Sequence, residues 1–324
     1  MRRSRNMAAS ANGPSVIRIS AIGPHAASSP MRRLESSPTI QDSWKGRVMT
    51  EAQPIIDFRL RPFSRHYDSG FSDAMVRRFF SGFGYDITAA ATDRSYESLR
   101  RELDEANIVK AVLPGRKVYD TTNAELFDYA ANDPDRFLVF PFLDVAKPDE
   151  ALDVIERDVV ERGAKGVSIE PLGGNDVRFD DERILPIYER LQQLGLPVMA
   201  TVSAFASDLI DNTIPRQIHH VVREFPNLTF IASHAGWPWV AEMVPIAFMN
   251  TNLYLLADFE GTRGNAAPEL RQAAERMIPD QVLFGSSFPL GPIAQGVRNI
   301  RDWHLDETEE RKVLHDTAAR ILGL

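Results

Sequence analysis

The chain has 324 residues and a formal net charge of −8, and its 44% apolar and 25% charged residues are ordinary for a globular protein. It contains no cysteine, which excludes disulfides and thiolate metal sites, so any metal would need carboxylates and some of the seven histidines as ligands. The acidic balance argues against nucleic acid as the main partner, and no apolar run reaches the ~18 residues of a membrane span.

The first 48 residues differ in composition from the rest. They hold eight arginines and lysines against two acids, Glu35 and Asp42, and are rich in Ser, Ala and Pro without sustained periodicity. We therefore expect a disordered basic leader over 1–48 and a single domain over 49–324. Arg-rich leaders are also typical of organelle transit peptides. Met49, just before the first predicted strand, favours the alternative of an upstream extension on a cytoplasmic protein.

From Met49 onward, short β-rich runs alternate with helical patterns. Amphipathic stretches cover 95–106 and 181–194, and Thr122 with Glu125 predicts a capping box. Eight strand–helix units predict a (β/α)8 TIM barrel of the α/β class. A doubly wound open sheet is the alternative, but no G-x-G-x-x-G follows the first strand. The strand runs are mostly uninterrupted apolar segments, as parallel strands covered on both sides should be; they are 54–60, 108–113, 137–143, 165–170, 197–202, 228–233, 252–257 and 281–285.

The connection at 62–94 is too long for a plain turn. It carries many aromatic residues, several glycines, His66 and Asp68, and a short helix is expected over 72–80. Loops of this length usually carry lids or binding functions, so His66 and Asp68 could close over a pocket. An aromatic-rich insertion serves a subunit contact equally well, which makes a homo-oligomer through 62–94 the alternative.

The carboxyl ends of the strands should be treated as one set, because the chemistry of TIM barrels lies there. His234 ends an apolar run, where it meets either a ligand or only a neighbouring loop. Trp237 nearby could wall a pocket or pack between strand and helix. The polar residues at the predicted strand ends are Arg59, Arg61, Asp144, Glu170, Thr201, Ser203, His234, Asp258, Ser286 and Ser287.

Several short motifs occur in a characteristic order from 54 to 324. They include IID at 55–57, NDPDRF at 132–137, GAKGV at 163–167, SHAGW at 233–237 and LFGS at 283–286. Together they resemble the amidohydrolase superfamily, in the branch that includes aminocarboxymuconate-semialdehyde decarboxylase, γ-resorcylate decarboxylase and pyrone-dicarboxylate lactonase. The resemblance implies a TIM barrel and a small-molecule enzyme.

The family's metal site is where this sequence departs from the pattern. The resemblance implies His-x-His after the first strand, where Arg59 and Arg61 stand, a histidine where Thr201 stands, and an aspartate where Ser287 stands. Only His234 is retained. Guanidinium groups do not ligate metals, and catalytic zinc generally uses three protein ligands. We therefore expect no metal and no other cofactor.

Two arginines beneath a barrel mouth need partners, because isolated buried charges are costly. Glu170 and Asp258 could neutralise Arg59 and Arg61 internally. A substrate carboxylate could instead bind them through bidentate contacts, and the two arrangements are compatible. The expected ligand is therefore a small anionic molecule.

The first functional hypothesis is hydrolysis of a carboxylate-bearing ester, lactone or amide without a divalent metal. His234, Glu170 and Asp258 are the candidate catalytic residues, with His234 as general acid or base. The alternatives are decarboxylation of a small or aromatic acid, a serine nucleophile at Ser286 or Ser287, and a barrel that has lost its chemistry. The candidate substrate-binding residues are Arg59, Arg61, Thr201, Ser203, Trp237, Ser286 and Ser287.

Overall fold

A computed structural model describes residues 53–63, 72–116, 121–171, 177–204 and 210–324. Residues Thr50–Leu324 form one compact unit. The predicted leader over 1–48 lies outside the described residues, as do His66 and Asp68. No helix within the described ranges has the length and apolar character needed to cross a membrane.

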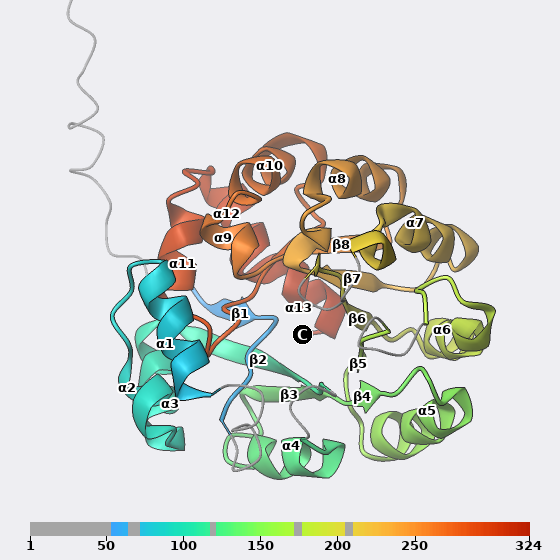
Figure 1. Cartoon of the computed structure of the whole chain (residues 1–324), viewed down its shortest axis with the longest axis horizontal. Helices are drawn as coiled ribbons and strands as arrows, with labels where there is room; N and C mark the ends of the chain where they lie inside the picture. Colours follow the sequence, from blue (N-terminus) through green and yellow to red (C-terminus); the bar gives the residue numbers. More distant parts are fainter. Residues whose placement is uncertain (1–52, 64–71, 117–120, 172–176, 205–209) are drawn as a thin grey trace, which may run out of the picture. The chain divides into compact units, whose positions relative to one another are not determined.

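Parallel strands form a ring, as predicted (Figure 1). The predicted run 137–143 is divided at Pro141, which has no N–H to donate. Its two parts continue the ring, because Pro141 O accepts from Ser168 N at 2.9 Å, and the ring closes where Phe58 N donates to Phe284 O at 2.9 Å. The strands are β1 (Ile55–Asp57), β2 (Ile108–Pro114), β3 (Phe137–Phe140), β4 (Phe142–Leu143), β5 (Val167–Ile169), β6 (Val198–Thr201), β7 (Phe230–Ser233), β8 (Leu253–Ala257) and β9 (Val282–Phe284).

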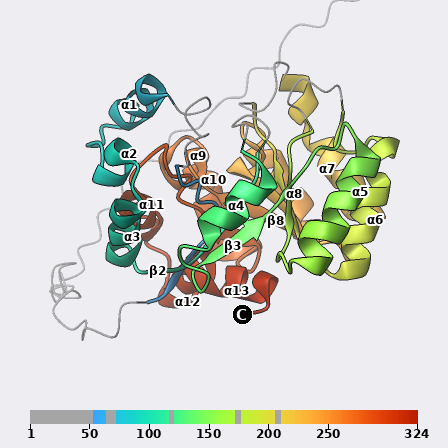
Figure 2. The same cartoon turned by 90° about the horizontal axis from the view of Figure 1, so that it is seen from below.

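Helices surround the strands (Figures 1 and 2). Three of them continue as π-helical turns at Ile155–Glu161, Ala273–Met277 and Lys312–Asp316. The α-helices are α1 (Asp73–Gly82), α2 (Ala89–Asp93), α3 (Tyr96–Glu105), α4 (Asn123–Ala130), α5 (Pro148–Val154), α6 (Leu185–Leu194), α7 (Pro215–Glu224), α8 (Val240–Met249), α9 (Glu260–Arg263), α10 (Ala267–Gln272), α11 (Ile293–Arg301), α12 (Glu307–Arg311) and α13 (Thr317–Leu322).

Local signals explain where several helices begin and end. The Thr122–Glu125 capping box opens α4 as predicted. Gly195 ends α6 with a φ of 66°, a left-handed conformation that glycine adopts without a steric penalty. The predicted helix at 181–194 begins as a 3₁₀ turn, Glu182–Ile184, and the predicted helix at 72–80 extends to Gly82. Element types were therefore predicted better than their boundaries.

Two apolar cores hold the barrel together. One fills the space between strands and helices. The other lies inside the ring, where Phe58 and Phe140 meet edge to face at 5.7 Å. Ala318 and Leu322 of α13 belong to this inner core, and Arg320 donates to Asp280 O, just before β9. Helix α13 therefore covers the amino-terminal end of the strands, which leaves the carboxyl-terminal end for the site.

Candidate functional site

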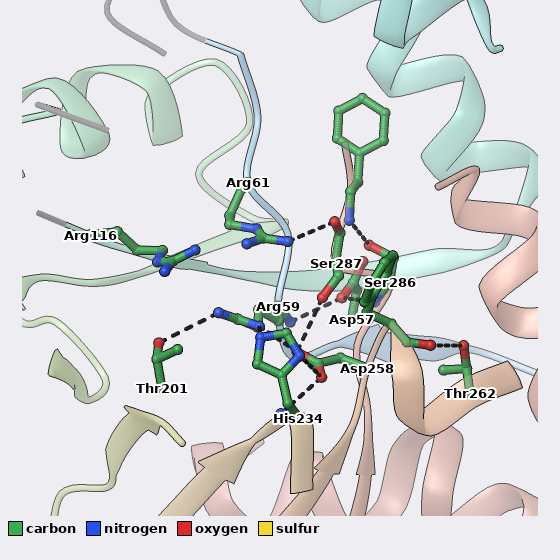
Figure 3. Close-up of polar contacts among 12 residues, drawn as sticks. Asp57, Arg59, Arg61, Arg116, Thr201, His234, Asp258, Thr262, Ser286 and Ser287 are labelled. Carbon is green, nitrogen blue, oxygen red and sulfur yellow. Dashed lines mark hydrogen bonds and ion pairs between the residues drawn. The ribbon is translucent and has the colours of Figure 1, made fainter. Parts of the chain in front are cut away.

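A buried ion pair joins the ends of β1 and β8. Arg59 Nη1 donates to Asp258 Oδ2 at 2.6 Å and to His234 Nε2 at 2.7 Å (Figure 3). The exposed fractions of Arg59, Asp258 and His234 are 1%, 0% and 5%. Three strand ends therefore meet in one cluster that water scarcely reaches. This is the internal neutralisation considered from the sequence, with Asp258 as the partner of Arg59.

The contacts of His234 determine which of its ring nitrogens carries the proton. A guanidinium can only donate, so Nε2 accepts and the proton lies on Nδ1, 3.0 Å from Asp258 Oδ1. Burial lowers the pKa of His234 to about 4, opposed by the charge of Asp258 and assisted by that of Arg59. The imidazole is therefore neutral at physiological pH. Burial alone would raise the pKa of Asp258, but His234 and Arg59 outweigh it, so that pKa lies well below its ordinary value.

A second group of contacts connects β6, β5 and the end of β2. Thr201 Oγ1 donates to Glu170 Oε1 at 3.0 Å, and Arg116 forms an ion pair with the same carboxylate. Arg59 Nη2 lies 3.5 Å from Thr201 Oγ1, which links this group to the first cluster. Glu170 thus pairs with Arg116, a residue outside the predicted set. The sequence could have indicated Arg116, because it lies two residues beyond β2 and the sites of TIM barrels lie at the carboxyl ends of their strands.

The junction of β1 and β9 is also polar. Asp57 Oδ1 accepts from the backbone N–H groups of Arg59 at 3.0 Å and Ser286 at 2.9 Å, and burial raises the pKa of Asp57. Arg61 Nη2 donates to Ser287 O at 2.8 Å, while Ser287 Oγ donates to Asp258 Oδ2 at 3.1 Å. Asp57 therefore fixes the backbone on which two predicted site residues stand. From the sequence, Asp57 was identified only as part of the IID motif at 55–57 and not as a site residue.

Backbone strain accompanies these strand ends. His234 has a φ of 57° and Ser287 a φ of 54°, in the left-handed region that non-glycine residues rarely adopt. Each such residue costs about 1–3 kcal/mol, and such costs concentrate at functional sites. Both of these side chains contact Asp258.

The remaining predicted site residues lie at the edge of the cluster or away from it. Ser203 is fully buried, and Ser286 Oγ accepts from Phe288 N at 3.1 Å. Trp237 is half-buried, and its Nε1 donates to Asn265 Oδ1 at 2.8 Å. Asp144 accepts from Ala146 N at 3.2 Å, which stabilises a local turn.

The donor set does not fit a divalent metal ion. Within the described ranges, no group of three or more histidine and carboxylate side chains is placed to hold one. His234 and Asp258 do lie together, but Arg59 donates to both of them. Two ligands that already bind a cation fall short of the three protein ligands usual for catalytic zinc.

Parallel strands closed into a barrel, with a buried polar cluster at their carboxyl ends, define a TIM-barrel protein whose site lies where enzymes of this fold carry theirs. Residues 56–324 match the model of the family described as Amidohydrolase. The chain belongs to this family, which confirms the resemblance seen in the sequence.

Solved structures support the same fold. An uncharacterised TIM-barrel protein from Bordetella bronchiseptica is 29% identical, with a TM-score of 0.78 over 83% of this chain and 98% of that one. A 2,6-dihydroxybenzoate decarboxylase from Rhizobium is 16% identical, with a TM-score of 0.61 over 84% and 99%. A dihydroxybenzoic acid decarboxylase from Polaromonas with bound manganese is 17% identical, with a TM-score of 0.63 over 84% and 98%. A search of curated proteins gives no match.

Proposed function

We propose that this protein is an enzyme that hydrolyses a small carboxylate-bearing ester, lactone or amide. The observation that carries the proposal is the neutral His234, whose Nδ1–H faces Asp258 and whose Nε2 faces Arg59. A carboxylate on Nδ1 holds the imidazole in one tautomer and stabilises the imidazolium formed when Nε2 takes up a proton.

Arg59 couples proton uptake to the developing charge. In the resting site its Nη1–H occupies the lone pair of His234 Nε2. When water attacks the substrate carbonyl, an oxyanion forms, and it competes for this N–H because a full negative charge attracts the guanidinium more strongly than a neutral ring nitrogen does. As Arg59 turns this hydrogen to the oxyanion, Nε2 accepts the proton of the attacking water and then delivers it to the leaving group.

Arg61 and Arg116 are the candidates to bind the substrate carboxylate. Both guanidinium groups stand at strand ends beside the cluster, and Arg116 is 12% exposed against 1% for Arg59. Bidentate contacts to a carboxylate suit arginine better than lysine. The two residues would hold the acid group while Arg59 and His234 act on the carbonyl.

The test is turnover of a panel of lactones, amides and aromatic acid esters by wild type and variants. His234→Gln should lower kcat about 10²–10⁴-fold, as loss of an acid–base group does. Arg61→Met should raise KM about tenfold or more with a smaller effect on kcat. Arg298→Met, on α11 and bonded to Gln295, is the matched control and should change neither. A folded protein that neither turns over nor binds any panel member would instead be a non-catalytic barrel.

Decarboxylation is the second candidate, favoured by the neighbours named as dihydroxybenzoate decarboxylases. An arginine cluster can stabilise the charge left when carbon dioxide departs. A substrate labelled with ¹³C at its carboxyl group separates the two reactions. Hydrolysis keeps the label in the acid product, whereas decarboxylation releases it as carbon dioxide.

A further inference from the structure

We propose that the Arg59 guanidinium is a built-in cation that takes the place of a divalent metal ion in this barrel. The fold accommodates such an ion, since the decarboxylase from Polaromonas contains manganese. In this chain the imidazole and carboxylate that would attract it, His234 and Asp258, both bind Arg59 instead. The inference concerns what holds the resting site together, so it is independent of the proposed reaction.

The hydrogen-bond count at Arg59 supports this assignment. Nη1 carries two hydrogens, and the two contacts at 2.6 and 2.7 Å use both of them. A metal ion at this point would need the same lone pairs on Asp258 Oδ2 and His234 Nε2. It would also lie within a few ångströms of a fixed positive charge, in a buried site where repulsion is weakly screened. Arg59 and a metal ion therefore exclude each other.

The neighbouring positions are engaged in ways that suit a guanidinium rather than a metal. Ser287 Oγ donates to Asp258 Oδ2, and Thr201 Oγ1 donates to Glu170 Oε1. A neutral hydroxyl that donates its hydrogen to a carboxylate adds no negative charge to a metal site. Among the described residues, Asp258 is therefore the carboxylate that forms an ion pair with Arg59.

Metal content is the first measurement. Wild-type protein purified without chelator, then incubated with Zn²⁺ or Mn²⁺ and desalted, should hold far less than one equivalent of metal at this site. Its Tm should not respond to either ion or to EDTA. His234→Gln is the control for metal bound elsewhere on the surface. One equivalent in wild type that disappears in His234→Gln would overturn the proposal.

Cation rescue is the second measurement. Arg59→Ala leaves Asp258 buried without its ion pair, so Tm should fall by about 5–10 °C. Adding ethylguanidinium should then raise the Tm of Arg59→Ala but not that of wild type. Arg61→Ala is the matched control, because it removes a neighbouring guanidinium bonded to the Ser287 carbonyl. Equal responses of the two variants, or no response of Arg59→Ala, would contradict the proposal, and the wild-type metal analysis tests it even if the variant does not fold.

Discussion

The Arg59–Asp258 pair joins two side chains that are almost completely buried. Bringing two charges out of water is costly, and a pair like this stabilises little relative to a well-packed apolar pair. Its presence therefore indicates a role other than general stability. The strained backbone at His234 and Ser287 supports the same conclusion, because both side chains are held on Asp258 at the expense of conformational energy.

The buried His234 should make stability depend on pH. Its folded-state pKa of about 4 lies below the ordinary 6.5, so between these values the unfolded chain binds a proton that the folded chain does not. Stability should therefore fall as pH decreases from 6.5 towards 4. The measurement is urea unfolding of wild type and His234→Gln at pH 7.5, 6.0 and 5.0.

The variant should lose less stability over this range than wild type does. Comparing how the free energy of unfolding changes with pH in the two proteins also removes the contribution of Asp57. Its raised pKa acts in the opposite direction, and it does so in both proteins. Parallel pH profiles for the two proteins would show that His234 is not held neutral by the fold.

Among the elements, the glycine before β5 shows how closely the barrel interior is packed. A Cβ on Gly166 would lie 2.5 Å from Phe140 Cζ and 2.9 Å from Pro197 Cγ. Gly166→Ala should therefore destabilise the protein by about 1–3 kcal/mol, as overpacking of a core does. Gly82→Ala is the control, because a Cβ there meets nothing within 4 Å and alanine favours the helix. Thermal unfolding of both variants is the measurement, and equal Tm values would contradict the packing argument.

The insertion after β1 is partly used for packing within the chain. Val76 and Phe80 of α1 are buried, and Phe79 and Phe83 meet Phe259 edge to face at 5.2 and 5.0 Å. Phe259 follows β8, so these contacts connect the insertion to the carboxyl-terminal end of the barrel. Several of its aromatic residues therefore have a structural role apart from any lid or subunit contact.

For the whole molecule, we expect the first 48 residues to be dispensable for folding. The compact unit that contains the barrel begins at Thr50, and the segment before it lacks the apolar content for a core. A chain starting at Met49 should show the Tm of the full-length protein to within about 2 °C, a shift worth roughly 1 kcal/mol or less. A clearly lower Tm for the shorter chain would mean that the leader contributes to the fold.

The sequence by itself determined the barrel, the approximate positions of its strands and most of the strand-end residues, Arg116 excepted. These follow from local patterns, because apolar runs and helical periodicity are visible within about 18 residues. The interruption at Pro141 was missed because the run 137–143 is apolar throughout its length apart from a proline that breaks only one hydrogen bond.

Only the tertiary structure decided which charges meet. Asp258 is 199 residues from Arg59 along the chain, and Glu170 is 54 from Arg116, so no local pattern encodes either pair. The sequence left Glu170 and Asp258 as equal partners for the arginines. The closure of the ring brings β1 beside β9 and places the end of β8 within reach of Arg59, and that geometry assigns Asp258 to Arg59 and leaves Glu170 to Arg116.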